Sequence, residues 1–286
     1  MRPHIEAFFD EATFTVTYLV ADPQTRTAAV IDPVLDYDPK AGRTSTQSTD
    51  AVLDAAKRAD FKIAWILETH AHADHISAGA YLREKTGAKI VIGKRITHTQ
   101  SIFAPVFNMK GFKPDGADFD RLVDDGETIE LGDMKIEVLF TPGHTPACIS
   151  FKLGDAVFIG DTLFMPDYGT ARTDFPGGDA GQLYRSIKRT LSLPGETRLF
   201  TCHDYKPAGR DRYAWESTVA EQHAKNIHIK DGVTEADFVA MRQARDKTLA
   251  KPVLILPAIQ VNIRAGRMPA PEDNGTAYLK IPLNKL

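Results

Sequence analysis

Cysteine is scarce in this sequence, with only Cys148 and Cys202 among 286 residues. Two cysteines cannot form the disulfide framework of a small secreted protein, so a reducing cytoplasm is the expected location. No base is implied beside Cys148, and Cys202 lies in a predicted strand. Both thiols are therefore expected to be buried packing residues rather than nucleophiles.

Long apolar runs and an excess of basic charge are also missing. The longest apolar run, residues 253–259, is too short to cross a bilayer and contains a proline. The first residues include acidic side chains where a secretion signal needs an apolar block. The net charge of −3 gives no reason to expect nucleic acid or an anionic membrane as a partner.

Strand and helix patterns alternate along the chain, but without the strict repeat of a doubly wound fold. Strands are predicted at 13–21, 27–33, 62–68, 88–92 and 198–204, and as two pairs joined by Gly-Asp turns within 127–140 and 148–160. Helices are predicted at 50–60, 75–86, 179–192, 212–228 and 234–249, followed by a proline-rich, extended tail from 250. This mixture predicts an α+β fold in which sheets are flanked by helices.

Histidine is concentrated in one short segment, LETHAHADHISAG, at residues 67–79. His70, His72 and His75 are three of the nine histidines, and Asp74 lies among them. Alternate residues at a strand end point to the same side, and this spacing is not that of the helical zinc motifs. Imidazole and carboxylate groups are ligands that zinc and iron accept, so the segment predicts a metal-binding loop.

Three more candidate ligands lie near predicted strand ends. They are His144 in TPGHTP, Asp161 in FIGDTLF and His203 in FTCHDY. A single histidine is usually a surface or packing residue, and an aspartate after glycine is usually part of a turn. The density of the 70–75 cluster is what makes a metal site the better interpretation.

The motifs THAHADH, TPGHT and GDTLF, followed by His203, together resemble the metallo-β-lactamase superfamily over about residues 10–210. The resemblance implies an αβ/βα sandwich of two mixed β-sheets flanked by helices, with the metal site at one edge. The whole chain, 1–286, would form one domain, with a helical and extended segment from about 210 packed near the site.

Within that superfamily, residues 169–187, 193–205 and 261–266 resemble the persulfide dioxygenases, or sulfur dioxygenases, of the ethylmalonic-encephalopathy-protein type. The resemblance implies oxidation of glutathione persulfide by O₂ to glutathione and sulfite at one Fe(II) ion per chain. Its implied iron ligands are His70, His144 and Asp161, a facial triad that leaves positions open for O₂ chemistry. The residues implied to orient these ligands or move protons are His72, Asp74, His75, His203 and Tyr205.

The same residues also fit two metal ions. One ion would take His70, His72 and His144, the other Asp74, His75 and His203, with Asp161 as a bridge. A hydroxide between two zinc ions would hydrolyse glutathione thioesters, as in glyoxalase II. Glyoxalase II usually has a glutamate where this chain has Asp204, and a longer helical C-terminal domain, so the resemblance favours the dioxygenase. A non-catalytic metal or sulfur sensor would not need so complete a set of ligands.

Substrate contacts are expected from arginine, because glutathione carries two carboxylates. Arg264, in the VNIRAG tail, is favoured slightly over Arg172, for which a salt bridge with Asp174 is an equally good explanation. Residues 37–50 and 104–120 look like insertions that would cover the mouth of the site or form a subunit contact. A homodimer is expected from base rates alone.

Overall fold

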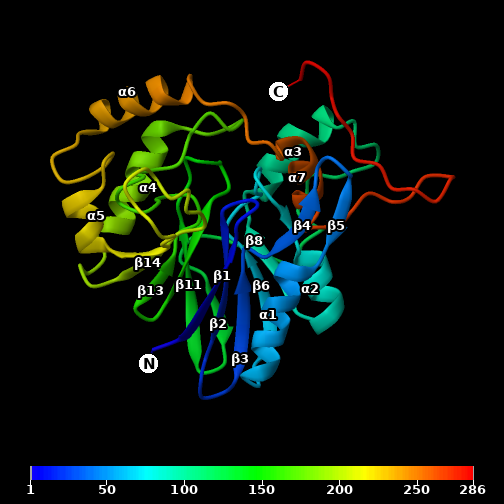
Figure 1. The fold of residues 1–286 in the computed structure, drawn as a ribbon, viewed down its shortest axis with the longest axis horizontal. Coiled ribbons are helices and arrows are strands. Elements are labelled where there is room, and N and C mark those ends of the chain that lie inside the picture. The colour runs from blue at the N-terminus through cyan, green and yellow to red at the C-terminus, as the bar shows by residue number, and fades with distance from the viewer. Residues whose placement is uncertain (1, 286) are drawn as a thin grey trace.

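Two six-stranded β-sheets pack against each other at the centre of the fold, in a computed structural model that describes residues 2–285 (Figure 1). The first sheet has the order β1 (His4–Asp10), β2 (Thr15–Ala21), β3 (Thr27–Ile31), β6 (Lys62–Glu68), β8 (Lys89–Gly93) and β9 (Arg121–Val123). The second has the order β10 (Thr128–Leu131), β11 (Met134–Phe140), β12 (Ile149–Leu153), β13 (Ala156–Phe158), β14 (Arg198–Phe200) and β15 (Glu216–Thr218). Both sheets mix parallel and antiparallel pairs, as predicted.

Helices cover the outer face of each sheet. Four helices lie beside the first sheet: α1 (Gln47–Arg58), α2 (Gly79–Thr86), α3 (Ile96–Val106) and α7 (Ile255–Asn262). Three lie beside the second: α4 (Ala180–Leu191), α5 (Val219–Lys225) and α6 (Glu235–Asp246). The molecule is therefore the α+β sandwich that the sequence predicted.

Strand β2 of the first sheet is buried on both faces. Val16 and Tyr18 of β2 pack toward the second sheet, whereas Leu19 and Ala21 pack toward the helices. Because successive side chains of a strand point to opposite faces, two apolar layers require an almost continuously apolar strand. That requirement explains the sequence TVTYLVA of β2, in which every residue is buried.

Two predicted helices are confirmed together with their capping residues. The Asp179 side chain accepts a hydrogen bond from the Gln182 amide at 2.6 Å and caps α4. The Thr234 hydroxyl accepts one from the Asp237 amide at 3.2 Å and caps α6. Each cap satisfies an amide that the first turn of a helix leaves unpaired.

Three predicted elements were wrong in part. The helix predicted at 75–86 begins only at Gly79, because β7 (Ile76–Ser77) pairs with β4 (Val34–Asp38). The helix predicted at 212–228 is replaced by β15 and the short helix α5, which a capping box starts at Thr218. The tail is not fully extended, because residues 255–262 form α7. In the first two cases the residues form strands because they pair with other segments of the chain, and local periodicity cannot predict such pairing.

The two segments interpreted as insertions take different positions. Residues 37–50 contain the end of β4, β5 (Arg43–Ser45) and the start of α1. Two of them, Tyr37 and Pro39, line a cavity between the two halves of the sandwich that also borders His144 and Asp161. Residues 104–120 contain the end of α3 and a series of turns, away from that cavity. Within residues 2–285, the helices are all too short or too polar to cross a membrane.

Candidate metal centre

The metal-binding loop follows β6 and carries its ligand candidates into the interior. His70, His72 and His75 expose 1%, 0% and 0% of their surface, although histidine is a polar residue. His144 follows β11, Asp161 follows β13, and His203 follows β14. The ends of β6 and of three strands of the second sheet thus meet at one edge of the sandwich.

One group of candidate ligands consists of His70, His144 and Asp161. The Oδ2 atom of Asp161 lies 4.0 Å from Nε2 of His70 and 3.6 Å from Nε2 of His144. These separations exceed hydrogen-bond lengths and are shorter than twice a metal–ligand distance of about 2.1 Å. An ion therefore fits between these three groups.

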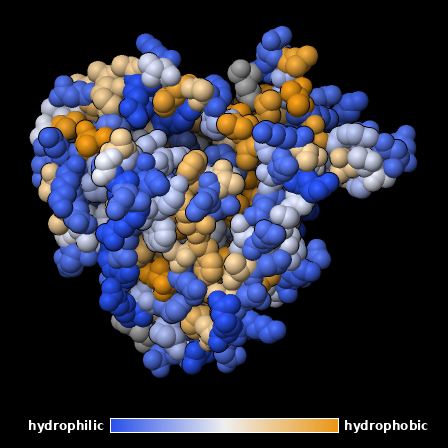
Figure 2. All heavy atoms as spheres, viewed as in Figure 1, coloured by the Kyte–Doolittle hydropathy of each residue, from blue (hydrophilic) through white to orange (hydrophobic). Residues whose placement is uncertain are grey.

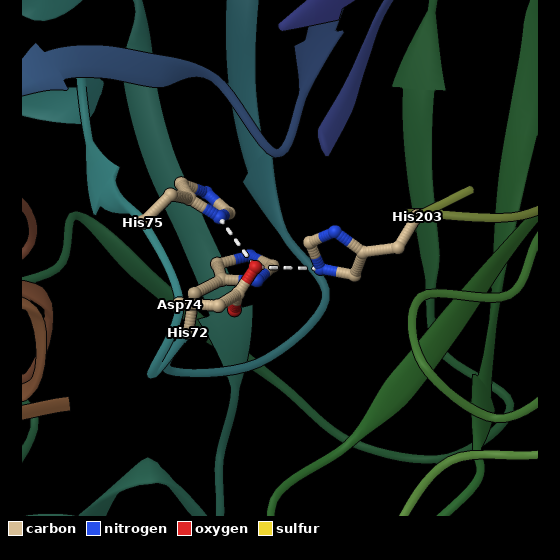
Figure 3. Close-up of side chains that lie close together, drawn as sticks. All are labelled: His72, Asp74, His75 and His203. Carbon is tan, nitrogen blue, oxygen red and sulfur yellow. Dashed lines mark ion pairs between the residues drawn. The ribbon is translucent and has the colours of Figure 1, made fainter. Parts of the chain in front are cut away.

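A second group consists of His72, Asp74, His75 and His203 (Figure 3). Asp74 is its centre: its Oδ2 atom lies 2.9 Å from Nε2 of His203 and 3.5 Å from Nδ1 of His75. Asp161 lies between the two groups, because its Oδ1 atom is 3.5 Å from Nε2 of His203. The structure thus brings together all seven residues that the sequence singled out as ligands.

Buried polar atoms without a partner test whether these residues fit a metal ion. Six such atoms belong to the two groups: Nε2 of His70, Nδ1 of His72, Oδ2 of Asp74, Nε2 of His75, Oδ1 of Asp161 and Nε2 of His203. None of the six forms a hydrogen bond of normal geometry within residues 2–285. The contact of Asp74 Oδ2 with His203 Nε2 at 2.9 Å is an ion pair that lacks this geometry, so these two atoms are counted here as well. Buried polar atoms are nearly always hydrogen-bonded, so their convergence at one place indicates a metal site. Imidazoles and carboxylates of this kind suit iron or zinc.

The other ring nitrogens of several histidines are anchored. Nε2 of His72 lies 3.0 Å from Oδ1 of the buried Asp32, Nδ1 of His144 lies 2.8 Å from the carbonyl of Arg172, and Nδ1 of His203 lies 3.2 Å from that of Phe14. Such contacts fix the ring orientation and leave the opposite nitrogen available to a metal. Sequence analysis missed Asp32, although it is also a polar residue that directly follows a buried strand.

The pKa values of these groups reflect burial and the neighbouring charges. Burial, together with His72 and His144, holds the pKa of His70 well below its usual value, so the ring is neutral and able to bind a metal. Burial alone would lower the pKa of His203, but Asp74 and Asp161 outweigh it and raise that pKa to about 9. His203 in turn holds the pKa of Asp74 well below its usual value, against the effect of burial. In the metal-free protein, Asp74 and His203 therefore form an ion pair.

A cavity of about 500 Å³ opens onto this centre. Asp74, His144 and Asp161 line it, together with aromatic side chains that include Phe164, Tyr168 and Tyr205. The Tyr205 ring stacks on that of His203, with centroids 5.6 Å apart and planes inclined by 19°. Figure 2 shows a hollow between the two sides of the molecule, with hydrophobic residues at its rim.

The two arginines proposed for the substrate are placed differently. Arg172 lines the cavity, but its Nε and Nη2 atoms donate to Asp174 at 2.5 and 2.7 Å, and its Nη1 atom donates to the carbonyl of Ala250 at 2.7 Å. The salt bridge with Asp174 is thus present, and all three guanidinium nitrogens of Arg172 already donate hydrogen bonds. Arg264 lies outside the lining of the cavity, because the tail approaches the centre as a helix rather than as an extended wall. Arg264 is therefore not among the residues that line this cavity, and a substrate contact at Arg264 stays a prediction.

The two cysteines are placed as predicted. Cys148 and Cys202 are both buried and free. Burial raises the pKa of the Cys148 thiol to about 12, so this group is protonated and unreactive at neutral pH.

Comparison with known proteins agrees with the fold. The family model described as the metallo-beta-lactamase superfamily matches residues 11–203. A probable metallo-hydrolase of Burkholderia pseudomallei (strain 1710b) is 54% identical and aligns over 99% of both chains. Glyoxylase B2 of Dictyostelium discoideum is 46% identical, over 100% of this chain and 98% of its own. The mitochondrial persulfide dioxygenase ETHE1 of Homo sapiens is 31% identical, over 92% and 88%.

Two further relatives concern length and three-dimensional structure. A beta-lactamase hydrolase-like protein of Agrobacterium fabrum is 54% identical over 99% of this chain, which spans only 65% of that protein. The crystal structure of ETHE1 from Myxococcus xanthus superposes with a TM-score of 0.74 at 32% identity, covering 92% of this chain and 100% of that one. This chain belongs to the metallo-β-lactamase superfamily.

Proposed function

We propose that the chain is a persulfide dioxygenase that oxidises glutathione persulfide with O₂ at one Fe(II) ion held by His70, His144 and Asp161. The observation that carries the proposal is a difference in spacing: the first ligand group has room for an ion, whereas two members of the second are already in contact. The first group has separations of 3.6 and 4.0 Å that leave room for an ion. In the second, Asp74 and His203 are already paired at 2.9 Å, so a second ion would have to break an ion pair.

The overall reaction consumes one persulfide, one O₂ and one water, and yields one thiol and one sulfite. The terminal sulfur is oxidised, the S–S bond breaks, and O₂ is the only oxidant required. An Fe(II) ion bound by a facial triad supplies the open positions for this O₂ chemistry.

The side chains around the ion would supply protons and orientation. In the metal-free protein His203 carries a proton at neutral pH, because Asp74 and Asp161 outweigh burial and raise its pKa to about 9. Burial, Asp74 and Asp161 raise the pKa of Tyr205 well above its usual value, so its hydroxyl also remains a donor. Both groups would thus offer protons near Asp161, where anionic sulfur and oxygen would have to be stabilised.

The cavity would hold the peptide part of the substrate. Arg245 and Lys251 line it, and Arg245 forms no ion pair with any residue of the described range 2–285. A substrate carboxylate would give Arg245 the paired hydrogen bonds that Arg172 already receives from Asp174. We therefore assign the substrate carboxylate to Arg245 in place of Arg172 and Arg264.

Thioester hydrolysis at two metal ions is the second candidate. It is favoured by the unpartnered atoms in both ligand groups and by the 46% identity to a protein named glyoxylase B2. In that case the Asp74–His203 pair would open to admit the second ion, and Asp161 would bridge the two.

Anaerobic purification with metal counting separates these candidates. The same preparation would be tested for O₂ uptake with glutathione persulfide and for hydrolysis of S-lactoylglutathione. One iron per chain with O₂ uptake is the expected result. Two metal ions per chain with thioester cleavage and no O₂ uptake would establish the hydrolase instead.

A further inference from the structure

Asn262, the last residue of α7, contacts the metal-binding loop although the two are far apart in sequence. Its Nδ2 atom donates to the carbonyls of His72 and His75, each at 2.8 Å. Its Oδ1 atom accepts from the amide of Ser77 at 2.8 Å. The side chain is 4% exposed, so water does not compete for these three bonds.

The loop depends on such contacts because it lacks regular structure between β6 and β7. Backbone carbonyls and amides that are buried without partners are costly, and a side-chain amide can satisfy both kinds. Asn262 does so for His72 and His75, two of the candidate ligands, and for Ser77, which follows them. Its amide thus fixes the backbone from which both rings project.

The surrounding contacts fix Asn262 itself. Gln100 of α3 donates from Nε2 to the carbonyl of Ile263 at 2.8 Å, which holds the end of α7. Gly266 packs so closely that an added Cβ would lie 2.7 Å from the carbonyl of Ser77. Its φ of +76° also belongs to the region that favours glycine. On the other side of the loop, the Ser77 hydroxyl donates to the buried carboxylate of Glu68.

We propose that Asn262 is a positioning residue of the metal centre, and that the segment 262–266 serves as its rigid support. The amide keeps the rings of His72 and His75 beside Asp74 and His203 before any metal binds. A preformed site binds metal more tightly than one that must be ordered by the ion. The inference requires a metal whose binding depends on His72 and His75, either as its ligands or through the contact of the His72 ring with that of His70, whose centroids are 4.1 Å apart. It requires no particular reaction, so it stands or falls separately from the proposed dioxygenase activity.

Asn262→Asp and Gln260→Glu form a matched pair for the test. Gln260 lies on the same helix, is 3% exposed and also makes three hydrogen bonds, but these go to Leu256 and Lys280. Both substitutions replace an amide nitrogen by a carboxylate oxygen of the same size. In Asn262→Asp the lost donations are those to His72 and His75, whereas in Gln260→Glu they lie away from the centre.

The readout is the rate at which metal-loaded protein gives its metal to a colorimetric chelator, measured beside the melting temperature of the metal-free form. Asn262→Asp should lose metal about 10- to 100-fold faster, the range typical of altered contacts behind a ligand. Gln260→Glu should lose metal at the wild-type rate, whatever its melting temperature. Equal rates for Asn262→Asp and wild type, or equal acceleration in both variants, would overturn the proposal.

Hydrogen exchange of the wild-type protein decides the question if Asn262→Asp does not fold. The proposal requires the Ser77 amide to exchange slowly in the metal-free protein, since Asn262 already protects it. Fast exchange that becomes slow only after metal is added would show that the ion, and not Asn262, orders the loop.

Discussion

The Oδ2 atom of Asp74 lies 2.9 Å from Nε2 of His203, and this contact joins the metal-binding loop to the second sheet. It occupies two of the groups that a second metal ion would need. Each group also stabilises the charge of the other. Burial alone would raise the pKa of Asp74 and lower that of His203, but His203 lowers the first and Asp74 raises the second. The pair is thus charged in the metal-free protein, and it lies within the group of His72, Asp74, His75 and His203.

Asp74→Asn should leave one metal ion per chain while lowering the rate of persulfide oxidation. The substitution removes the charge that contributes to the pKa of about 9 at His203, but it leaves His70, His144 and Asp161 unchanged. Metal content by elemental analysis and O₂ uptake would be measured on the same sample. Complete loss of metal from Asp74→Asn would contradict a single ion bound by the other group.

Asp161→Ala should abolish metal retention, because Asp161 is the one carboxylate that faces both ligand groups. Asp155→Ala is the matched control, since Asp155 also follows a glycine but forms ion pairs with Arg2 and Arg198 at the surface. Metal content should fall below about a tenth of wild type in the first variant, given the 10- to 100-fold cost of disturbing even indirect contacts. It should be unchanged in the second. Full iron content in Asp161→Ala would show that the ligand assignment is wrong.

The candidate ligands of the centre could be recognised in the sequence because they follow predicted strands. Buried strands have strong patterns, and a polar residue where such a pattern ends is easy to recognise. The strand ends of a sandwich meet at a common edge, so His70, His144, Asp161 and His203 converge without any further information. Asp32 obeys the same rule and was missed only because it is a single acid with no neighbouring histidine.

The role of the C-terminal segment could not be predicted in the same way. The VNIRAG motif predicts a substrate contact for Arg264 only if the segment is extended. Once residues 255–262 form a helix, Asn262 reaches the metal-binding loop and Arg264 does not reach the cavity. Which face of a short helix meets a distant loop depends on tertiary packing, and local sequence contains little information about it.

Acid should destabilise the metal-free protein through His228. Burial, Arg242 and Arg245 lower the pKa of this ring to about 4, and its Nδ1 atom accepts from the Thr170 amide at 3.0 Å. His228 binds a proton near pH 6.5 in the unfolded chain but only near pH 4 in the folded one. Its contribution to the free energy of unfolding is therefore fully present above pH 6.5 and is lost as the pH falls from 6.5 to 4. The loss is at most about 1.4 kcal/mol per pH unit, and less because the ring is partly exposed.

His228→Asn keeps an acceptor for Thr170 but does not titrate, so it tests this origin. Urea unfolding of both proteins at pH 7 and pH 5 would give the change in unfolding free energy. The decrease between the two pH values should be smaller in the variant. An equal decrease in both proteins would assign the acid sensitivity to other groups, such as the buried histidines of the centre.

Arg245→Gln should weaken substrate binding without changing the chemical step. Arg245 lines the cavity from α6, and the other two arginines of the lining are already engaged, Arg172 by Asp174 and Arg242 by Asp246. Loss of a charge-assisted contact to a carboxylate costs about 1.4 kcal/mol, or about tenfold in KM for glutathione persulfide. A contact that is equally strong in the ground state and the transition state changes KM and leaves kcat nearly constant.

Lys247→Gln is the matched control for that substitution. Lys247 ends the same helix and carries the same charge, but it is exposed and lies outside the lining of the cavity. If long-range attraction of an anionic substrate were the cause, both variants would raise KM to a similar extent, and salt would remove the effect. A rise confined to Arg245→Gln, together with a smaller rise for a persulfide that lacks the carboxylates, would locate the peptide part of the substrate at α6. Unchanged KM in Arg245→Gln would place the substrate carboxylates elsewhere in the cavity.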